Sequence, residues 1–337
     1  MADKLFLDSG WKCWVAENAL RGRPANELTR ILVENGFPED HASLEVETAF
    51  NHPYIAAGSS VIRQLSKRDW VLHTNRLLLE SGPSQLTEIW NSIDAKEFFE
   101  RHYRVNRPLV IRGGCNSMAA MRKWTPDYLK QVAGDRDVQI QGGRDSDPGY
   151  EINDRKHRQT CNFGELVDKT FSAVETNDFY MTANNADNNS QAFAELWEDV
   201  VPLPSFLDPE SAAESMFFWM GPAGTVTPLH HDLTNNLMIQ IRGRKRVKLI
   251  APEYLPYLYN HLHCYSRVDP ENVDESRFPL FRNVHVTEVT IGPGDILFLP
   301  VGWWHHVRGL DPTITITCTN FHGINRFTDH YHTYDQI

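Results

Sequence analysis

Thr313-Ile-Thr-Ile-Thr-Cys-Thr-Asn-Phe321 is the stretch that decides the fold, because threonine alternates along it with apolar residues. Successive side chains of a strand point to opposite faces of a sheet, so this alternation predicts a half-buried β-strand. Other short runs rich in strand-forming residues precede it, each bounded by Gly, Pro or Asn: Met216–Met220, Leu237–Ile241, Val247–Ile250, His285–Ile291 and Ile296–Leu299. Many short strands separated by turn residues are typical of a barrel or a sandwich.

A helical segment precedes this β-rich part. Leu28, Ile31 and Leu32 recur at three- and four-residue intervals, Gly36 ends the repeat, and Pro38 can begin the next helix. Apolar residues continue in this manner to about residue 79. We therefore expect residues 1–90 to form a small N-terminal domain of three or four helices, and residues 91–337 to form a second, β-rich domain.

The composition is that of an ordinary globular protein, with 41% hydrophobic and 23% charged residues. The net charge of −11 argues against a nucleic-acid partner, because such binding depends on Lys and Arg at the phosphates. No apolar run approaches the roughly 18 residues that span a bilayer, and Met1-Ala-Asp-Lys4 lacks the features of a signal peptide. We expect a cytoplasmic protein that binds no membrane. The five scattered cysteines encode neither a disulfide framework nor a zinc ribbon.

His230 and Asp232 are two metal-ligand types spaced two residues apart. On a strand their side chains project from one face and can reach one point, whereas His231 between them faces away. A third ligand is available in His305, which follows the strand Ile296–Leu299. Two histidines and one carboxylate on one face of an octahedron favour Fe(II) and leave positions open for catalysis. Because His-x-Asp also occurs by chance, the pattern alone leaves a purely structural role open.

A longer series of motifs surrounds these three residues. It comprises Thr227-Pro-Leu-His-His-Asp232, Asn236, Gln240, Gly243, Lys245-Arg246, Ser266-Arg-Val-Asp269, Phe278-Pro279, Gly292-Pro-Gly-Asp-Ile-Leu-Phe-Leu-Pro300, Trp303-Trp-His-His306 and Asn320-Phe321. In order and spacing, the chain from about Leu86 to Arg326 resembles the JmjC hydroxylases. Its motifs are most similar to those of the asparaginyl hydroxylase that inhibits hypoxia-inducible factor and of its bacterial cupin-like relatives.

The resemblance implies an α+β, mainly β fold, in which a double-stranded β-helix (jelly-roll or cupin) core carries flanking helices. It also implies a catalytic Fe(II) ion held by His230, Asp232 and His305, with 2-oxoglutarate as co-substrate and O2 as oxidant. The corresponding function is a non-haem iron dioxygenase that hydroxylates a protein or peptide side chain and releases succinate and CO2.

The resemblance further implies how 2-oxoglutarate sits. Lys245 matches the lysine that pairs with its distal carboxylate, and Thr227 and Tyr180 match residues that hydrogen-bond the same group. Asn236 and Asn320 match positions near the iron. Structural alternatives remain for each residue: a solvated lysine at a strand end, a core tyrosine, and amides that close turns.

Three other functions stay open at this point. The same oxidation applied to an N-methyl carbon would make the protein a demethylase, and a cupin without activity would be a binding module. A zinc or manganese enzyme at the same triad is disfavoured by Lys245 and Thr227, which serve 2-oxoglutarate. A homodimer is possible, with the N-terminal helices as the candidate interface.

Overall fold

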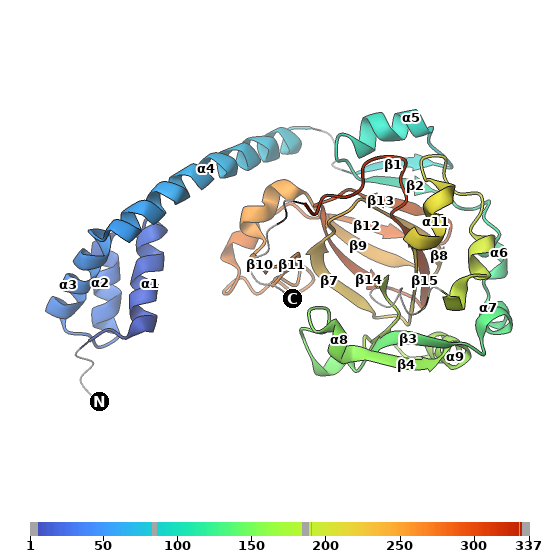
Figure 1. Ribbon diagram of the computed structural model, residues 1–337, viewed down its shortest axis with the longest axis horizontal. Coiled ribbons are helices and arrows are strands. Elements are labelled where there is room, and N and C mark those ends of the chain that lie inside the picture. Colours follow the sequence, from blue (N-terminus) through green and yellow to red (C-terminus); the bar gives the residue numbers. More distant parts are fainter. Residues whose placement is uncertain (1–5, 83–85, 184–188, 190, 330, 332–337) are drawn as a thin grey trace. The chain divides into compact units, whose positions relative to one another are not determined.

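The computed structural model of the protein describes residues 6–82, 86–183, 189, 191–329 and 331. It divides into two compact units, Met1–Leu78 and Leu79–Ile337 (Figure 1). The division falls earlier than the boundary predicted at residue 90. Thr87–Trp90 belongs to the second unit, because it forms a strand, β1, which pairs in parallel with β2 (Leu109–Arg112) in a sheet of that unit.

The first unit is helical. Its core contains Leu28 and Leu32, the residues whose spacing predicted a helix, and both are fully buried. Gly36 has a φ of +92°, which ends the second helix because only glycine adopts this conformation freely. The helices are α1 (Ser9–Leu20), α2 (Ala25–Glu34), α3 (Glu39–Phe50) and α4 (Pro53–Glu80).

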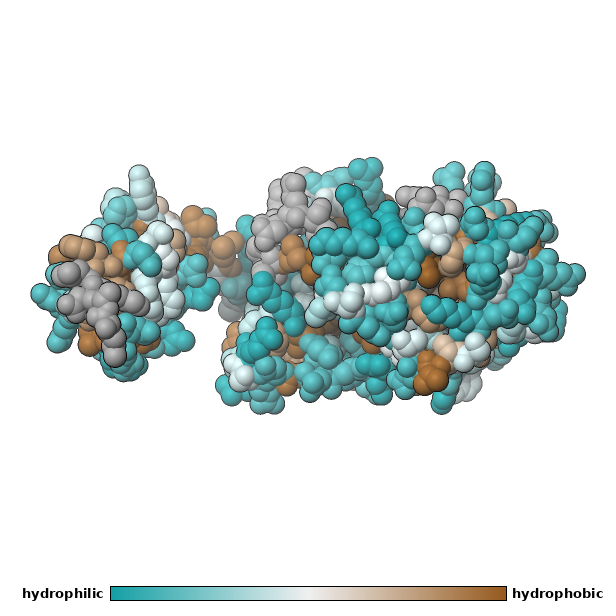
Figure 2. Space-filling view, turned by 90° about the horizontal axis from the view of Figure 1, so that it is seen from below, coloured by the Kyte–Doolittle hydropathy of each residue, from teal (hydrophilic) through white to brown (hydrophobic). Residues whose placement is uncertain are grey.

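Helix α4 carries large apolar side chains that stay exposed, among them Val61, Leu65 and Trp70. Figure 2 shows hydrophobic residues on the surface of this helical unit. These side chains are candidates for the homodimer interface, which stays a prediction. Across the described ranges, no helix combines the length and the hydropathy that crossing a membrane requires.

The second unit is built around two six-stranded sheets (Figure 1). One has the strand order β1-β2-β13-β8-β15-β6, and the other has the order β10-β11-β7-β14-β9-β12. Chain-sequential strands from β6 to β9 and from β12 to β15 therefore alternate between the sheets, which is the winding of a double-stranded β-helix. The predicted α+β, mainly β fold with a jelly-roll core is confirmed. The strands of this core are β6 (Met216–Gly221), β7 (Val226–His231), β8 (Asn236–Arg242), β9 (Lys245–Ile250), β12 (Thr287–Ile291), β13 (Ile296–Leu299), β14 (Trp304–Gly309) and β15 (Thr313–Cys318).

Strand β15 is buried on both faces, not on one face as its alternation predicted. Its isoleucines pack into the outer apolar core, and its threonines face the barrel interior. There Thr315 Oγ1 donates a hydrogen bond to Gln240 Oε1 at 2.8 Å, and Trp219 Nε1 donates to Thr317 Oγ1 at 2.9 Å. Because these hydroxyls find partners inside, they tolerate burial. The barrel interior is consequently polar enough to hold a site.

Helices pack against the outer face of the β15 sheet, and a small third sheet of order β4-β3-β5 reaches the edge strand β6 through a bridge between Met181 and Met220. The chain after β1 forms α5 (Ala95–Phe98), which continues into a π-helical turn over Phe99–Tyr103. Thr125 caps α7 (Pro126–Ala133) by accepting a hydrogen bond from the backbone of Tyr128. The other elements of this layer are α6 (Ala120–Lys123), α7 (Pro126–Ala133), α8 (Asp154–His157), α9 (Phe163–Ser172), α11 (Ala212–Ser215), β3 (Asp137–Gly142), β4 (Arg158–Asn162) and β5 (Phe179–Tyr180).

A long excursion, residues 251–286, separates two strands that are direct neighbours. Strand β9 ends at Ile250, β12 begins at Thr287, and the two pair antiparallel with Thr287 opposite Leu249. The excursion contains β10 (Asn260–Leu262) and β11 (Tyr265–Ser266). Strand β11 returns to the barrel and pairs with β7, where Tyr265 lies opposite His230.

Candidate metal centre

Three potential metal ligands converge at one end of the barrel. His230 is on β7, Asp232 follows that strand directly, and His305 is on β14, opposite His230 in the antiparallel ladder. Asp232 Oδ1 lies 3.7 Å from His230 Nε2, and Asp232 Oδ2 lies 3.9 Å from His305 Nε2. One potential ligand atom from each residue lies within 4.8 Å of the other two. Three such atoms can bind one ion.

The two imidazoles are oriented by backbone carbonyls. His230 Nδ1 lies 2.8 Å from the Pro228 carbonyl oxygen, and His305 Nδ1 lies 3.1 Å from the Trp303 carbonyl oxygen. A carbonyl only accepts, so each Nδ1 carries the hydrogen and each Nε2 keeps its lone pair. Both lone pairs are thereby available to a metal, with the kind of outer hydrogen bond that metal-binding histidines normally make.

Burial and mutual charge set the protonation of this group. Burial lowers the pKa of His230, which favours the neutral imidazole. Burial alone would raise the pKa of Asp232, but the charges of His305 and His230 and a hydrogen bond from Asn236 together outweigh it and lower this pKa. The site therefore favours a neutral imidazole at His230 and an ionised carboxylate at Asp232, the forms that bind a metal.

Lys245 and Tyr180 lie in the same pocket as the three ligands. The Lys245 side chain is 1% exposed, and its Nζ donates a hydrogen bond of 2.9 Å to Tyr180 Oη. Within the described residues no carboxylate pairs with this ammonium, and burial lowers its pKa to about 7. A buried cation without a counter-ion is costly, so the pocket favours an anionic ligand. A 2-oxoglutarate carboxylate fits this requirement.

The remaining predicted residues divide into two groups. Thr227 and Asn236 line the pocket, and Asn236 Nδ2 donates to Asp232 Oδ2 at 3.1 Å while its buried Oδ1 has no partner in the described part of the chain. Asn320 is not among the pocket-lining residues. Its Nδ2 donates to the carbonyl of Asp208 at 2.7 Å, so this amide anchors a loop.

Several pocket residues escaped the sequence analysis. Trp219 and Thr317 form one wall through the hydrogen bond described above, and Met238, Leu299 and Val307 form apolar walls. The available signal was the alternation within each strand, because every second residue of a jelly-roll strand faces the interior. Using it required knowing which face was the interior.

A second group of potential ligands, Asp269, Glu271 and His306, lies elsewhere on the barrel. Glu271 already accepts hydrogen bonds from Arg246 at 2.5 Å and from Arg308 at 2.6 Å. Two guanidinium groups beside the carboxylate oppose a further cation. We assign no metal to this group.

Residues 95–325 match the family model described as a cupin-like domain, and the chain belongs to the cupin-like JmjC family. This family generally uses Fe(II) and 2-oxoglutarate with O2, and the three convergent ligands offer a matching donor set.

Similar proteins come from several organisms. "Lysine-specific demethylase 8" of Xenopus tropicalis is 31% identical over 230 residues, covering 66% of this chain and 50% of that protein. "JmjC domain-containing protein D" of Dictyostelium discoideum is 33% identical over 219 residues, covering 58% and 47%. "tRNA wybutosine-synthesizing protein 5" of Homo sapiens is 29% identical over 232 residues, covering 64% and 71%. The match spans about half the length of the first two relatives.

Proposed function

We propose that the protein is an Fe(II)- and 2-oxoglutarate-dependent dioxygenase that hydroxylates a protein or peptide side chain and releases succinate and CO2. The observation that carries this proposal is the buried Lys245 ammonium, which faces the same pocket as the convergent His230, Asp232 and His305. A metal triad alone fits many reactions. A triad beside a buried lysine that lacks a carboxylate partner among the described residues fits an oxygenase whose co-substrate carries a distal carboxylate.

Each residue of the pocket has a distinct part in this proposal. His230, Asp232 and His305 hold the ion, which supplies the oxidation of a C–H bond with O2 and 2-oxoglutarate when bound. Lys245 and Tyr180 bind and orient the distal carboxylate, and the Thr227 hydroxyl adds a further hydrogen bond. Asn236 orients the Asp232 carboxylate. The apolar walls exclude water from the reacting atoms.

A second candidate function is N-methyl demethylation. Three of the relatives, from Xenopus tropicalis, Arabidopsis thaliana and Danio rerio, carry the name lysine-specific demethylase. The chemistry is the same, because a hydroxylated N-methyl carbon forms a hemiaminal that collapses. Our preference for hydroxylation rests on the predicted resemblance of the site motifs to those of the asparaginyl hydroxylase; the relatives reported above carry demethylase, JmjC-domain and wybutosine-synthesis names. A non-catalytic cupin would tolerate lost ligands, and all three are present.

The test is succinate formation from 2-oxoglutarate by the full chain with Fe(II) and ascorbate, followed by mass spectrometry of peptides from a native cell extract. Hydroxylation adds the mass of one oxygen atom to a peptide, whereas demethylation removes the mass of one methylene. Absence of succinate from iron-loaded protein under all substrate mixtures would refute the oxygenase proposal.

A further inference from the structure

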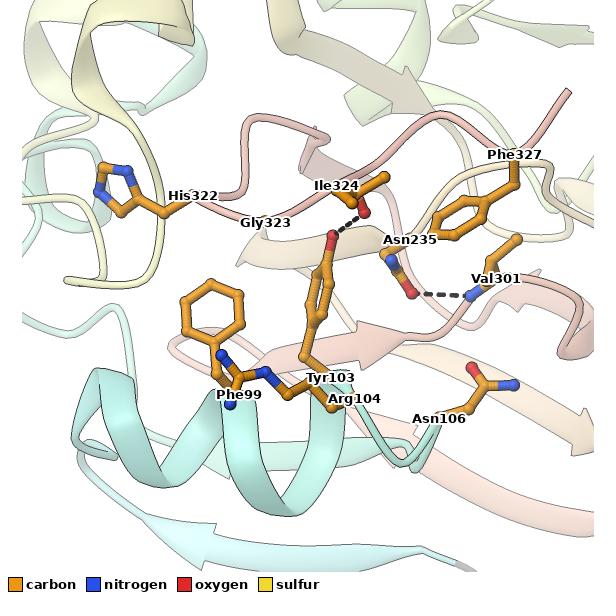
Figure 3. A pocket seen from close by; sticks show the side chains of 10 residues that line it. All are labelled: Phe99, Tyr103, Arg104, Asn106, Asn235, Val301, His322, Gly323, Ile324 and Phe327. Carbon is orange, nitrogen blue, oxygen red and sulfur yellow. Dashed lines mark hydrogen bonds between the residues drawn. The ribbon is translucent and has the colours of Figure 1, made fainter. Parts of the chain in front are cut away.

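A second cavity, of about 670 Å³, lies outside the metal pocket (Figure 3). This volume is within the range of roughly 300–1,000 Å³ that is typical of ligand-binding sites. We call it the docking cavity. Its walls come from the π-helical turn after α5 and from Arg104 and Asn106, which follow it, from the loops before β8 and after β13, and from the segment that follows β15.

Hydrogen bonds hold these walls in place. Tyr103 Oη donates to the Ile324 carbonyl at 2.6 Å, and the Val301 backbone N–H donates to Asn235 Oδ1 at 2.9 Å; both bonds are drawn in Figure 3. Asn325 accepts from the Asn235 backbone at 2.7 Å and donates to its carbonyl at 2.9 Å. The cavity is therefore preformed, which reduces the entropic cost of binding.

The docking cavity adjoins the metal pocket. Asn235 lines the cavity, and the next residue, Asn236, lines the metal pocket and bonds to Asp232. On the neighbouring strand, Leu299 lines the metal pocket and Val301 lines the cavity. The ends of β8 and β13 thus form a common wall. Consecutive residues of an extended chain point to opposite faces, so the two pockets lie on the two sides of this wall, and a chain that crosses its end reaches both.

The lining of the docking cavity specifies a ligand with three features. Phe99, Tyr103 and Phe327 supply aromatic surface for an apolar group. Arg104 is the one lining residue with a formal charge at neutral pH, and its guanidinium makes no hydrogen bond or ion pair with the described chain. Asn106 Oδ1 is buried and has no partner among the described residues, so it favours an N–H donor.

We propose that the docking cavity binds an extended segment of the protein substrate that carries a bulky apolar side chain next to an acidic residue. This inference rests on the proposed function, because it concerns the chain that delivers a residue to the metal pocket. A peptide meets all three requirements at once: a backbone N–H for Asn106, an apolar side chain for the aromatic walls, and a carboxylate for Arg104.

The test uses fluorescence anisotropy with the full chain in EDTA, so that neither metal nor 2-oxoglutarate takes part. The probes are three fluorescein-labelled peptides: Glu-Glu-Trp-Leu-Glu-Glu, its charge-reversed form Lys-Lys-Trp-Leu-Lys-Lys, and Glu-Glu-Ser-Ser-Glu-Glu without apolar side chains. We expect the first peptide to bind at least tenfold more tightly than either of the others. Equal binding of all three, or no binding of the first, would overturn the proposal.

Matched arginine variants locate the binding. Arg104→Glu should reverse the preference, so that the lysine peptide binds more tightly than the glutamate peptide. Arg101→Glu is the control, because its side chain lies one turn earlier, is 74% exposed and does not line the cavity. It should retain the preference of the unchanged protein. If both variants lose it equally, the recognition is general surface attraction and the docking cavity is not the site.

A second variant keeps the test independent of charge. Phe327→Ser removes an aromatic wall that is 42% exposed, so little stability depends on it. It should weaken binding of Glu-Glu-Trp-Leu-Glu-Glu at least fivefold and leave Glu-Glu-Ser-Ser-Glu-Glu unchanged; unaltered binding of the first peptide would count against the cavity.

Failure of this inference and failure of the proposed function are distinguishable. Protein that forms succinate without preferring the acidic apolar peptide refutes the docking cavity alone. Protein that shows the preference but forms no succinate refutes the oxygenase.

Discussion

Lys245 Nζ donates a hydrogen bond to Tyr180 Oη across 65 positions of sequence, and both side chains are buried in the pocket of the metal centre. Burial lowers the pKa of Lys245 to about 7 and raises the pKa of Tyr180. The tyrosine is therefore a neutral partner that does not compensate a charge on the lysine. An anionic ligand does, and several measurable consequences arise from this pair.

Replacing Lys245 with methionine should stabilise the ligand-free protein and abolish its co-substrate binding. The fall in pKa from 10.5 to about 7 shows that a charged Lys245 is held at a cost, which exceeds the roughly 1 kcal/mol of the hydrogen bond lost from Tyr180. We expect Lys245→Met to raise the melting temperature and to weaken 2-oxoglutarate binding by roughly a hundredfold or more in calorimetry.

The matched control for this variant is Lys248→Met on the same strand. Lys248 Nζ bonds outside the pocket, to the Pro270 carbonyl at 2.7 Å. Its replacement should leave the 2-oxoglutarate affinity unchanged. Equal losses in the two variants would show that the lysine at 245 has no special part.

The stability of the ligand-free protein should rise with pH between about 7 and 10.5 through Lys245. In this window the unfolded chain, with the ordinary lysine pKa of 10.5, binds a proton that the folded chain has lost. Stability increases with pH wherever the unfolded state binds more protons. Urea denaturation at several pH values should show this slope, and Lys245→Met should flatten it. An identical slope in the variant would contradict the assignment.

Binding of 2-oxoglutarate should have the opposite dependence on pH. The anion requires the ammonium form of Lys245, which the free protein loses above a pKa of about 7. Affinity measured by calorimetry should therefore fall above neutral pH, by up to roughly tenfold per pH unit. Affinity that stays constant up to pH 9 would mean that the carboxylate finds its partner elsewhere.

Neighbouring histidines should differ sharply in their effect on metal binding. His230→Ala removes a ligand, so stoichiometric Fe(II) binding and succinate formation should be lost. His231 instead packs edge-on against Trp304, with ring centroids 4.7 Å apart, and does not line the pocket. His231→Gln should still bind one equivalent of iron after anaerobic dialysis. Loss of the metal from both proteins would indicate a folding defect, which circular dichroism would reveal.

Replacing the two asparagines predicted for the site should have different effects on metal affinity and on stability. Asn236→Ala removes the hydrogen bond to Asp232 Oδ2, and loss of such an outer partner lowers metal affinity by roughly 10- to 100-fold. Asn320→Ala removes the anchor on the Asp208 carbonyl and should lower stability without changing metal affinity. Competition with a fluorescent chelator measures the first effect, and thermal unfolding the second. A larger metal defect in the Asn320 variant would reverse our assignment.

Much of the barrel was predictable from strand composition alone. Ile296–Leu299 has the predicted bounds, and Leu237–Ile241 and Val247–Ile250 are each extended by one or two residues at their ends. Such strands are apolar and end at glycine or proline, so their bounds can be predicted from neighbouring residues in the sequence. Strand β14 escaped prediction because Trp304, His305 and His306 begin it, and ligand residues interrupt the apolar pattern.

The site was predictable only where its residues are close in sequence. His230 and Asp232 lie two residues apart at the end of β7, and this spacing alone suggests that both side chains reach one point. The proximity of Tyr180 to Lys245 depends on how β5 is placed against the barrel, and this is a tertiary property. Asn320 occupies the position that the family motif predicts for the site. In the structure, however, its side-chain amide donates a hydrogen bond to the Asp208 carbonyl.

The excursion over residues 251–286 leaves and re-enters the barrel at two adjacent strands, so its length does not affect the ladder that sets His305 opposite His230. The segment is thus an insertion whose two ends lie side by side on paired strands. Provided that the pairing of Tyr265 with His230 is kept, loops of other lengths and compositions could be grafted there to change substrate preference while the ligand geometry stays constant.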